Sequence, residues 1–198
     1  MTRRIPIVST LVVLAAVATM LWLGVWQLHR KEWKEVEIAR YEAAQASGVE
    51  VRWPTSPAQF DGALYHRSRL DCALVTAMSA MAGRSADGQS GWAHVAQCSL
   101  PGGGTAAVAL GWSNDPQTPQ WRGGPVTGWV AGSDKAVRLI ASPPQAGLAQ
   151  LARPDPTNVA TTPMGHLSYA IQWFAFATIA LVIYGLALRK KSRADTLK

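Results

Sequence analysis

The chain has 198 residues, of which 48% are hydrophobic and 16% charged, and its net charge is +7. This length suits one modest domain together with membrane segments. The excess positive charge lies mainly at the two ends of the chain, which argues against a nucleic-acid-binding face on a soluble domain. The sequence has no paired nucleophile and base, phosphate-binding glycine loop or metal-protease motif, so it predicts a protein that is not an enzyme.

The first predicted element is a transmembrane helix over residues 5–28, a run without charged residues that is rich in Leu, Val, Ala and Trp. At about 1.5 Å per residue, a helix of this length crosses a hydrocarbon core of about 30 Å. A cleavable signal peptide would have a shorter apolar core and a small-residue cleavage site, whereas this run ends in GVWQLHR. A retained helix is therefore favoured, preceded by a short cytoplasmic tail, residues 1–4.

Residues 29–50 continue as a juxtamembrane helix, in which charges alternate in sign and Gly48 is a plausible stop. Pro54 and Pro57 are expected to end any helix, and short strands separated by Gly-rich turns follow. The candidate strands are Leu64–Met78, Trp92–Leu100, Thr105–Trp112, Pro125–Val130 and Val137–Ala141. This spacing predicts an antiparallel β-sheet or small β-barrel over residues 51–141. Residues 142–166 are rich in Pro, Ala and Thr without periodicity, which predicts an extended return segment.

A second uncharged run, residues 167–188, predicts another transmembrane helix, and a basic tail, residues 189–198, follows it. The two tails carry six of the seven excess positive charges, so by the positive-inside rule both termini are expected to be cytoplasmic and the middle segment periplasmic. An apolar run that begins at the fifth residue leaves no Arg- and Ser-rich transit peptide. These features favour the inner membrane of a bacterium.

Cys72 and Cys98 are the only cysteines, and both fall in the predicted periplasmic part, where disulfides persist. They lie on separate candidate strands, so a disulfide requires those strands to be adjacent. Two unpaired structural thiols are an equal alternative. A metal site is less favoured, because copper and zinc sites usually have closely spaced cysteines.

His166 stands at the start of the second apolar run, in GHLSYAIQWFAFA. On a helix, His166, Tyr169, Ala170 and Trp173 share one stripe. The positive end of the helix dipole disfavours an imidazolium and leaves a neutral nitrogen that can bind a metal. Small alanines would let a flat macrocycle approach, and haem iron commonly takes a histidine ligand. The competing interpretation is an interfacial histidine in an ordinary aromatic belt.

The end of the first span carries a second stripe, whose members are spaced by three or four residues: Trp22, Trp26, His29, Arg30 and Trp33. In a two-helix hairpin, His29 and His166 lie at about the same membrane depth. Arg30 at that level suits a partly desolvated carboxylate. Anchoring of the span by Trp, Arg and Lys is the alternative.

These two stretches carry a family resemblance. LGVWQLHRKEWK, residues 23–34, resembles the Leu-Gly-x-Trp-Gln-x-x-Arg-x-x-Trp-Lys signature of the surfeit locus protein 1 family, the assembly factors of cytochrome c oxidase. GHLSYAIQWFAFA, residues 165–177, resembles the opening of that family's second span. YHRSRL, GWAHV, the Gly111–Trp112 pair and PVTGWV are similar to weaker family landmarks, so the resemblance covers nearly the full chain.

The resemblance implies a non-enzymatic assembly factor, or chaperone, that assists the handling or insertion of haem a into the catalytic subunit of the oxidase. The family's haem-associated histidine corresponds to His166. We predict that His166 binds the haem iron, with Trp26, Arg30, Tyr169 and Trp173 as further cofactor-binding residues. The implied partners are the catalytic subunit, proteins of haem a synthesis or oxidase assembly, and membrane lipid. The alternative function is a membrane scaffold that docks on and stabilises the oxidase core without binding haem.

The chain departs from the family pattern in its middle and just before His166. Ala109 and Leu110 stand where the family usually has Asn-Arg, and Gly165 stands where it usually has Asn. The segment from Val137 to Gly165 is also shorter than in many members. The family's residue roles are therefore carried over only at the two ends of the chain.

Overall fold

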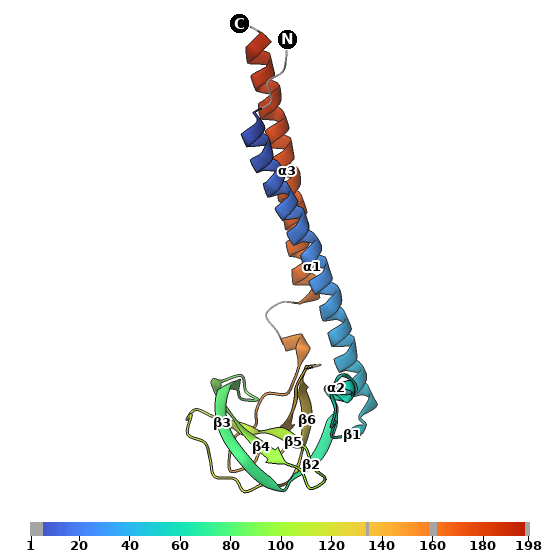
Figure 1. Cartoon of the computed structure of the whole chain (residues 1–198), viewed down its shortest axis with the longest axis vertical. Coiled ribbons are helices and arrows are strands. Elements are labelled where there is room, and N and C mark those ends of the chain that lie inside the picture. Colours follow the sequence, from blue (N-terminus) through green and yellow to red (C-terminus); the bar gives the residue numbers. More distant parts are fainter. Residues whose placement is uncertain (1–5, 134, 159–161, 197–198) are drawn as a thin grey trace. The chain divides into compact units, whose positions relative to one another are not determined.

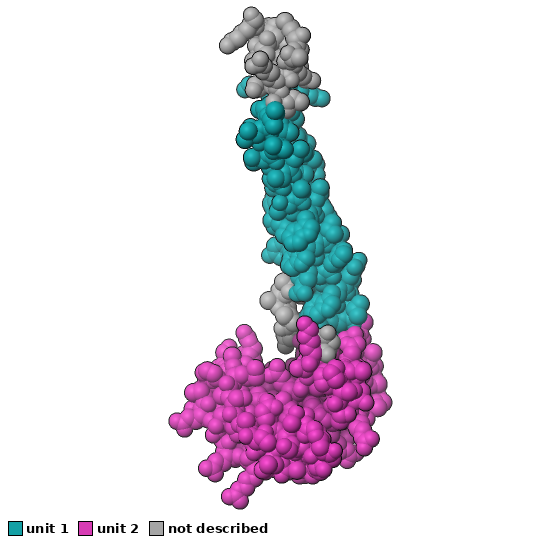
Figure 2. All heavy atoms as spheres, in the orientation of Figure 1, with its two compact units in different colours: residues 1–37, 157–198 teal, residues 38–156 magenta. Residues whose placement is uncertain are grey.

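The computed structural model describes residues 6–133, 135–158 and 162–196. The expected N-terminal tail, residues 1–4, lies outside this range. The chain divides into two compact units, coloured separately in Figure 2: Met1–Glu37 with Thr157–Lys198, and Ile38–Pro156. The first unit contains a pair of helices and the second a β domain (Figure 1).

Helix α1 (Ile7–Ser47) runs without a break through both the first expected span and the expected juxtamembrane helix. It stops because Gly48 adopts a left-handed conformation, with φ of 57°. The described part of α1 is long and apolar enough to cross a membrane.

Helix α3 (Pro163–Thr196) begins with a Thr-Pro pair that caps it. The Thr162 hydroxyl accepts a hydrogen bond of 3.2 Å from the backbone N–H of Gly165, and Pro163 occupies the first turn, where a missing N–H costs nothing. Because of this cap, His166 lies in the first turn of the helix rather than in the preceding segment. Helix α3 also meets the length and composition needed to cross a membrane.

The two helices run antiparallel and pack along one seam (Figure 1). Buried and half-buried positions recur at alternating intervals of three and four residues, the repeat of a coiled coil. On α1 they are Thr10, Val13, Val17, Met20, Gly24, Gln27, Lys31 and Lys34, and on α3 they are Pro163, His166, Ala170, Trp173, Ala177, Ala180 and Tyr184.

Small residues allow close approach along this seam. Gly24, Ala170 and Ala177 are buried. A Cβ atom on Gly24 would lie 2.6 Å from Cε1 of Phe174, so a larger residue there would displace that ring.

The β domain is one mixed, open sheet of seven strands in the order β1-β2-β6-β7-β5-β4-β3. The strands are β1 (Glu50–Arg52), β2 (Arg67–Cys72), β3 (Leu74–Arg84), β4 (Ser90–Ser99), β5 (Thr105–Ser113), β6 (Gly124–Gly132) and β7 (Val137–Ala141). Antiparallel pairing, as expected, joins β2 to β6, β6 to β7, β5 to β4 and β4 to β3. Two pairs, β1 with β2 and β5 with β7, are parallel.

The parallel pairing of β7 follows from a tight hairpin. Ser133 N–H donates to Ala136 O across the turn, which places β7 antiparallel to β6. Strand β7 then fills the space between β6 and β5, and on its other edge it meets β5 in the parallel sense. The hairpin-length spacing in the sequence predicts the antiparallel pairing of β7 with β6. It does not predict the parallel pairing of β7 with β5.

Two other elements differ from the sequence prediction. A helix, α2 (Pro57–Ala63), begins at a proline that was expected only to end helices, because the first helical turn needs no N–H from its leading residue. The single strand expected over Leu64–Met78 is two strands, β2 and β3, which meet at Ala73. No glycine or proline marks that corner in the sequence.

Both faces of the sheet are covered. Val108 and Leu110 point into the larger core together with Ala44 of α1, whereas Ala109 between them faces a second cluster closed by Leu151. A 3-10 helix, η1 (Pro156–Asn158), follows this covering segment. His94 is fully buried, and its Nε2 lies 2.8 Å from Oγ of Ser113.

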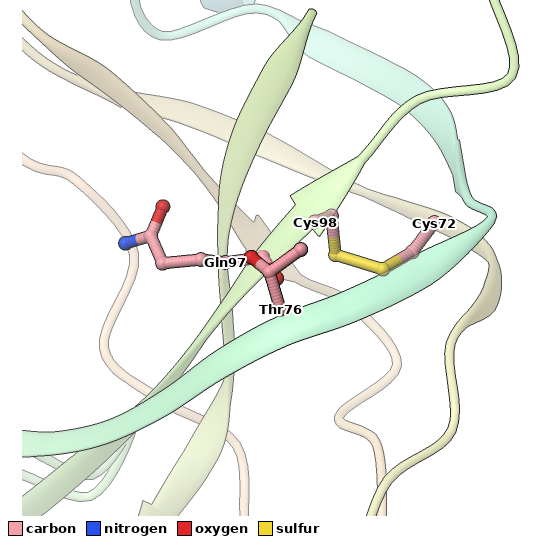
Figure 3. The surroundings of a disulfide bond; sticks show 4 residues. All are labelled: Cys72, Thr76, Gln97 and Cys98. Carbon is pink, nitrogen blue, oxygen red and sulfur yellow. A yellow bond between two sulfur atoms is a disulfide. The ribbon is translucent and has the colours of Figure 1, made fainter.

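Cys72 and Cys98 form a disulfide (Figure 3). Strands β2 and β4 are not neighbours in the sheet, but the corner at Ala73 brings the end of β2 beside β4: Ala73 N–H donates to Ser99 O, and Val75 pairs with Cys98. The disulfide therefore ties the last residue of β2 to the β3–β4 ladder. Of the two alternatives left open by the sequence, the bridge is the one that the structure shows.

Reduction of this disulfide should destabilise the β domain. The bridge closes a loop with a sequence separation of 26, for which the chain-entropy model gives about 3.5 kcal/mol. Denaturant unfolding of the full chain, with and without reductant, measures the difference. The Cys72→Ala, Cys98→Ala double variant should have the same unfolding midpoint as the reduced wild type, and reductant should not change that midpoint. Equal midpoints for the oxidised and reduced wild type would contradict the expectation.

Replacing Gly24 should weaken the helix pair. Alanine is favoured over glycine inside a helix by up to about 1 kcal/mol, but at Gly24 overpacking against Phe174 should cost about 1–3 kcal/mol. Gly185 on α3 is the matched control, because a Cβ atom added there would meet no other side chain within 4 Å. SDS titration in mixed micelles, followed by near-UV circular dichroism, should show Gly24→Ala unfolding earlier and Gly185→Ala no earlier than wild type. The reverse order would contradict the packing.

Candidate functional site

A hydrogen bond between two polar side chains lies in the seam of the helix pair. The Nδ1 atom of His166 on α3 is 2.7 Å from Oε1 of Gln27 on α1, and the histidine is only 8% exposed. Because an amide oxygen can only accept, Nδ1–H is the donor. A neutral ring that carries its proton on Nδ1 keeps an unprotonated lone pair on Nε2.

His166 lies in the first turn of α3 and donates from Nδ1 across the seam. Within the part of the chain that the structure describes, Nε2 has no hydrogen-bond partner. The ring is thus held at one nitrogen and available at the other, which is the arrangement of a metal-binding histidine supported by a neighbouring acceptor.

Three of the other predicted site residues lie beside the seam, whereas Trp173 lies in it. Trp26 is 46% exposed, Tyr169 is 52% exposed, and Arg30 is also exposed. Arg30 follows Gln27 by three residues, and Tyr169 follows His166 by three. Three residues fall about 60° short of a full helical turn, so each side chain points about 60° away from the seam. In an antiparallel pair, equal rotations about the two axes turn both residues towards the same flank. Trp26, one residue before Gln27, falls on that flank as well.

Aromatic contacts accompany this flank. The Arg30 guanidinium lies 4.9 Å from the ring centroid of Trp33, a cation–π distance. Trp173, half-buried at the seam, meets Phe176 edge to face, with ring centroids 6.3 Å apart. His29 is exposed and stands two residues from Gln27, about 200° around the helix, so it points away from His166.

Sequence reasoning singled out His166 but not Gln27, its hydrogen-bond partner across the seam. The stripe of Trp26, Arg30 and Trp33 was selected for its aromatic and basic side chains, but the helix contact uses the neighbouring stripe of Gly24 and Gln27. The signal that would have identified it is the interval of three and four residues that these positions share with Val17 and Met20.

The donor set restricts what this site can bind. No group of three or more His, Cys, Asp or Glu side chains that could hold a metal ion occurs among the described residues. A bare ion therefore finds too few ligands here, whereas a metal that brings four ligands of its own, as in a macrocycle, needs only one protein nitrogen. His166 Nε2 fits that second requirement.

The β domain contains a separate cavity of about 670 Å³. It lies beside β1, α2 and the β4–β5 turn, and its lining includes Arg52, Trp53, Arg69 and Asp71. The lining offers one carboxylate and neither histidine nor cysteine, so it lacks the ligands of a metal site.

Comparison with known proteins identifies the family. A family model described as the SURF1 family matches residues 14–178, a stretch that contains both helix motifs and the whole β domain. A comparison with curated proteins finds no match. Members of the SURF1 family are generally cytochrome oxidase assembly factors and are not enzymes. Since the match covers well over half of its length, this chain belongs to the SURF1 family.

Proposed function

We propose that the protein assists the assembly of a haem-copper cytochrome c oxidase by holding haem a at His166 before the haem enters the catalytic subunit. The observation that carries the proposal is the Gln27–His166 hydrogen bond, which fixes the ring and leaves Nε2 as a neutral ligand nitrogen. Family membership supplies the oxidase context. Haem a would supply a flat, apolar macrocycle with an iron centre and two carboxylates.

The flank beside the seam suits such a group. Trp26 and Trp173 provide aromatic surface next to His166, and Tyr169 lies on the same side one turn along α3. Arg30 lies one turn beyond Gln27 towards the end of the span and is in reach of a propionate at the edge of the macrocycle. In this proposal these residues orient the haem, and His166 alone binds its iron.

The membrane location expected from the sequence is compatible with a haem bound in this orientation. With both termini in the cytoplasm of a bacterium and the β domain in the periplasm, Gln27 and His166 lie at the periplasmic border of the inner membrane. An apolar macrocycle at that depth remains in lipid, while its carboxylates point towards water. The partners in this scheme are the catalytic subunit of the oxidase and the proteins that make haem a or assemble the enzyme.

The visible spectrum of the purified protein tests the proposal. Full-length wild type from cells that make haem a should contain haem, and His166→Ala should lose most of it, because the iron ligand is gone. His29→Ala is the matched control, since His29 is exposed on the opposite side of α1 at about the same depth. It should keep the wild-type spectrum.

Unchanged haem content in His166→Ala would sink the proposal. In that case, capture of oxidase subunits by haem-free protein would favour the alternative, a membrane scaffold that stabilises the oxidase core through the helix pair. Under that alternative, the His166 hydrogen bond serves only to fix the register of the two helices.

A further inference from the structure

Strand β3 (Leu74–Arg84) ends the sheet on the side opposite β1, and its outer edge has no strand partner (Figure 1). It has 11 residues, which is about twice the length of an average strand. Among the described residues, this outer edge is paired only at its far end, where Leu151 forms an isolated antiparallel bridge with Ser85. The backbone groups of β3 before Ser85 are therefore open to a further strand.

Hydrogen bonds at this bridge show which backbone groups of β3 point outward. Arg84 O accepts a hydrogen bond of 2.9 Å from Ala152 N–H, which lies on the outer side. Ser85 N–H donates instead to Gln89 O, in the turn that leads to β4. Successive residues thus present their backbone groups to alternate sides, as in any antiparallel ladder.

The same alternation defines the free edge. Counting back from Arg84 in steps of two, three more residues present both N–H and C=O outward: Ala82, Ala80 and Met78. The count stops at Ala77, where a bulge interrupts the ladder between β3 and β4. The free edge is therefore the stretch Ala77–Gly83, which has Ala80 at its centre.

The sequence of β3 lacks the devices that usually keep an edge strand from pairing. No charged residue and no proline occurs from residue 72 to residue 83. The opposite edge strand, β1, has only three residues, begins at Glu50, ends at Arg52 and is followed by Pro54. Shortness, charge and proline protect sheet edges, so β1 is protected and β3 is not.

We propose that β3 pairs antiparallel with β3 of a second copy of this chain, about a two-fold axis at Ala80. When Ala80 lies opposite Ala80, Ala77 falls opposite Gly83, so the free edge of each copy covers that of the other. The outward-pointing residues then form three pairs, and each pair exchanges two backbone hydrogen bonds. This assembly closes at two copies, because it uses the free β3 edge of both and leaves the protected β1 edges outside.

The side chains agree with this register. Met78 falls opposite Ala82 of the second copy and Met81 opposite Ser79, so each methionine faces a small side chain. Arg84 lies beyond the paired stretch and does not face its own counterpart. A charged segment of another protein would find no opposite charge on the free edge, whereas a neutral copy of the same strand needs none. A second copy is therefore the partner that this edge suits best.

Cysteine cross-linking of the full chain in detergent tests the register. In Ala80→Cys, the two introduced cysteines would form one hydrogen-bonded pair with Cα atoms about 5.5 Å apart, which suits a disulfide. Mild oxidation should link most of this variant into dimers. Cys72 and Cys98 are bonded to each other and buried, so they leave no thiol to compete.

Ala77→Cys is the matched control on the same strand. Its two cysteines would be displaced by six residues in the proposed register, about 20 Å along the strand, so this variant should not cross-link. Ala77 is exposed and Ala80 is half-buried, so accessibility alone would predict the opposite order.

Sedimentation equilibrium of the same detergent-solubilised chain measures the association itself. The wild type should change from monomer to dimer as its concentration rises. Ala80→Lys should raise the dissociation constant of the dimer about fivefold, because two like charges would face each other at the axis, and Ala80→Glu should do the same. An equimolar mixture of these two variants should recover the dimer, since opposite charges then meet.

Four results would contradict pairing through β3. A wild type that stays monomeric would overturn it, as would a mixture of the two charged variants that does not recover the dimer. Cross-linking of Ala77→Cys as readily as Ala80→Cys would show that the chains meet elsewhere or in another register. Capture of an oxidase subunit by monomeric wild type, lost in Ala80→Lys, would assign the edge to a strand of that partner. None of these results bears on haem binding at His166.

Discussion

The hydrogen bond between Gln27 and His166 is the constraint on which the helix pair depends. The seam around it contains small residues such as Gly24, Ala170 and Ala177, which permit sliding by one repeat, and a second hydrogen bond joins the hydroxyls of Thr10 and Tyr184 towards its other end. A polar pair can be satisfied in only one register, because either partner left alone in apolar surroundings would lose its hydrogen bond. The register of the hairpin, and with it the flank beside the seam, follows from such contacts, and Gln27–His166 is the one at the site.

That register also couples structure to the proposed chemistry. Once Gln27 is opposite His166, the ring has a fixed tautomer and a fixed orientation, and Arg30 follows one helical turn beyond Gln27. The same interaction therefore serves packing and ligand binding. A scaffold without haem would require only the packing part, in which case the free Nε2 of His166 would have no role.

Sequence alone predicted the parts that depend on composition and short-range pattern. Uncharged runs located both long helices, and turn residues located most strands, including β7 (Val137–Ala141). The insertion of β7 between β5 and β6, and the corner at Ala73 that allows the disulfide, depend on contacts between distant segments. At the site, His166 was identifiable by its residue type and position. Gln27 was not, because which stripe of α1 faces α3 is decided by packing.

The tautomer of His166 tests the central claim most directly. Nitrogen NMR of the full chain in micelles, with ¹⁵N-labelled histidine and His166→Ala to assign the signal, distinguishes Nδ1–H from Nε2–H. The account predicts a neutral ring protonated at Nδ1 in the wild type, and a loss of that preference when Gln27 is replaced by leucine. A wild-type ring protonated at Nε2 would contradict it, since the nitrogen proposed to bind iron would then carry the proton.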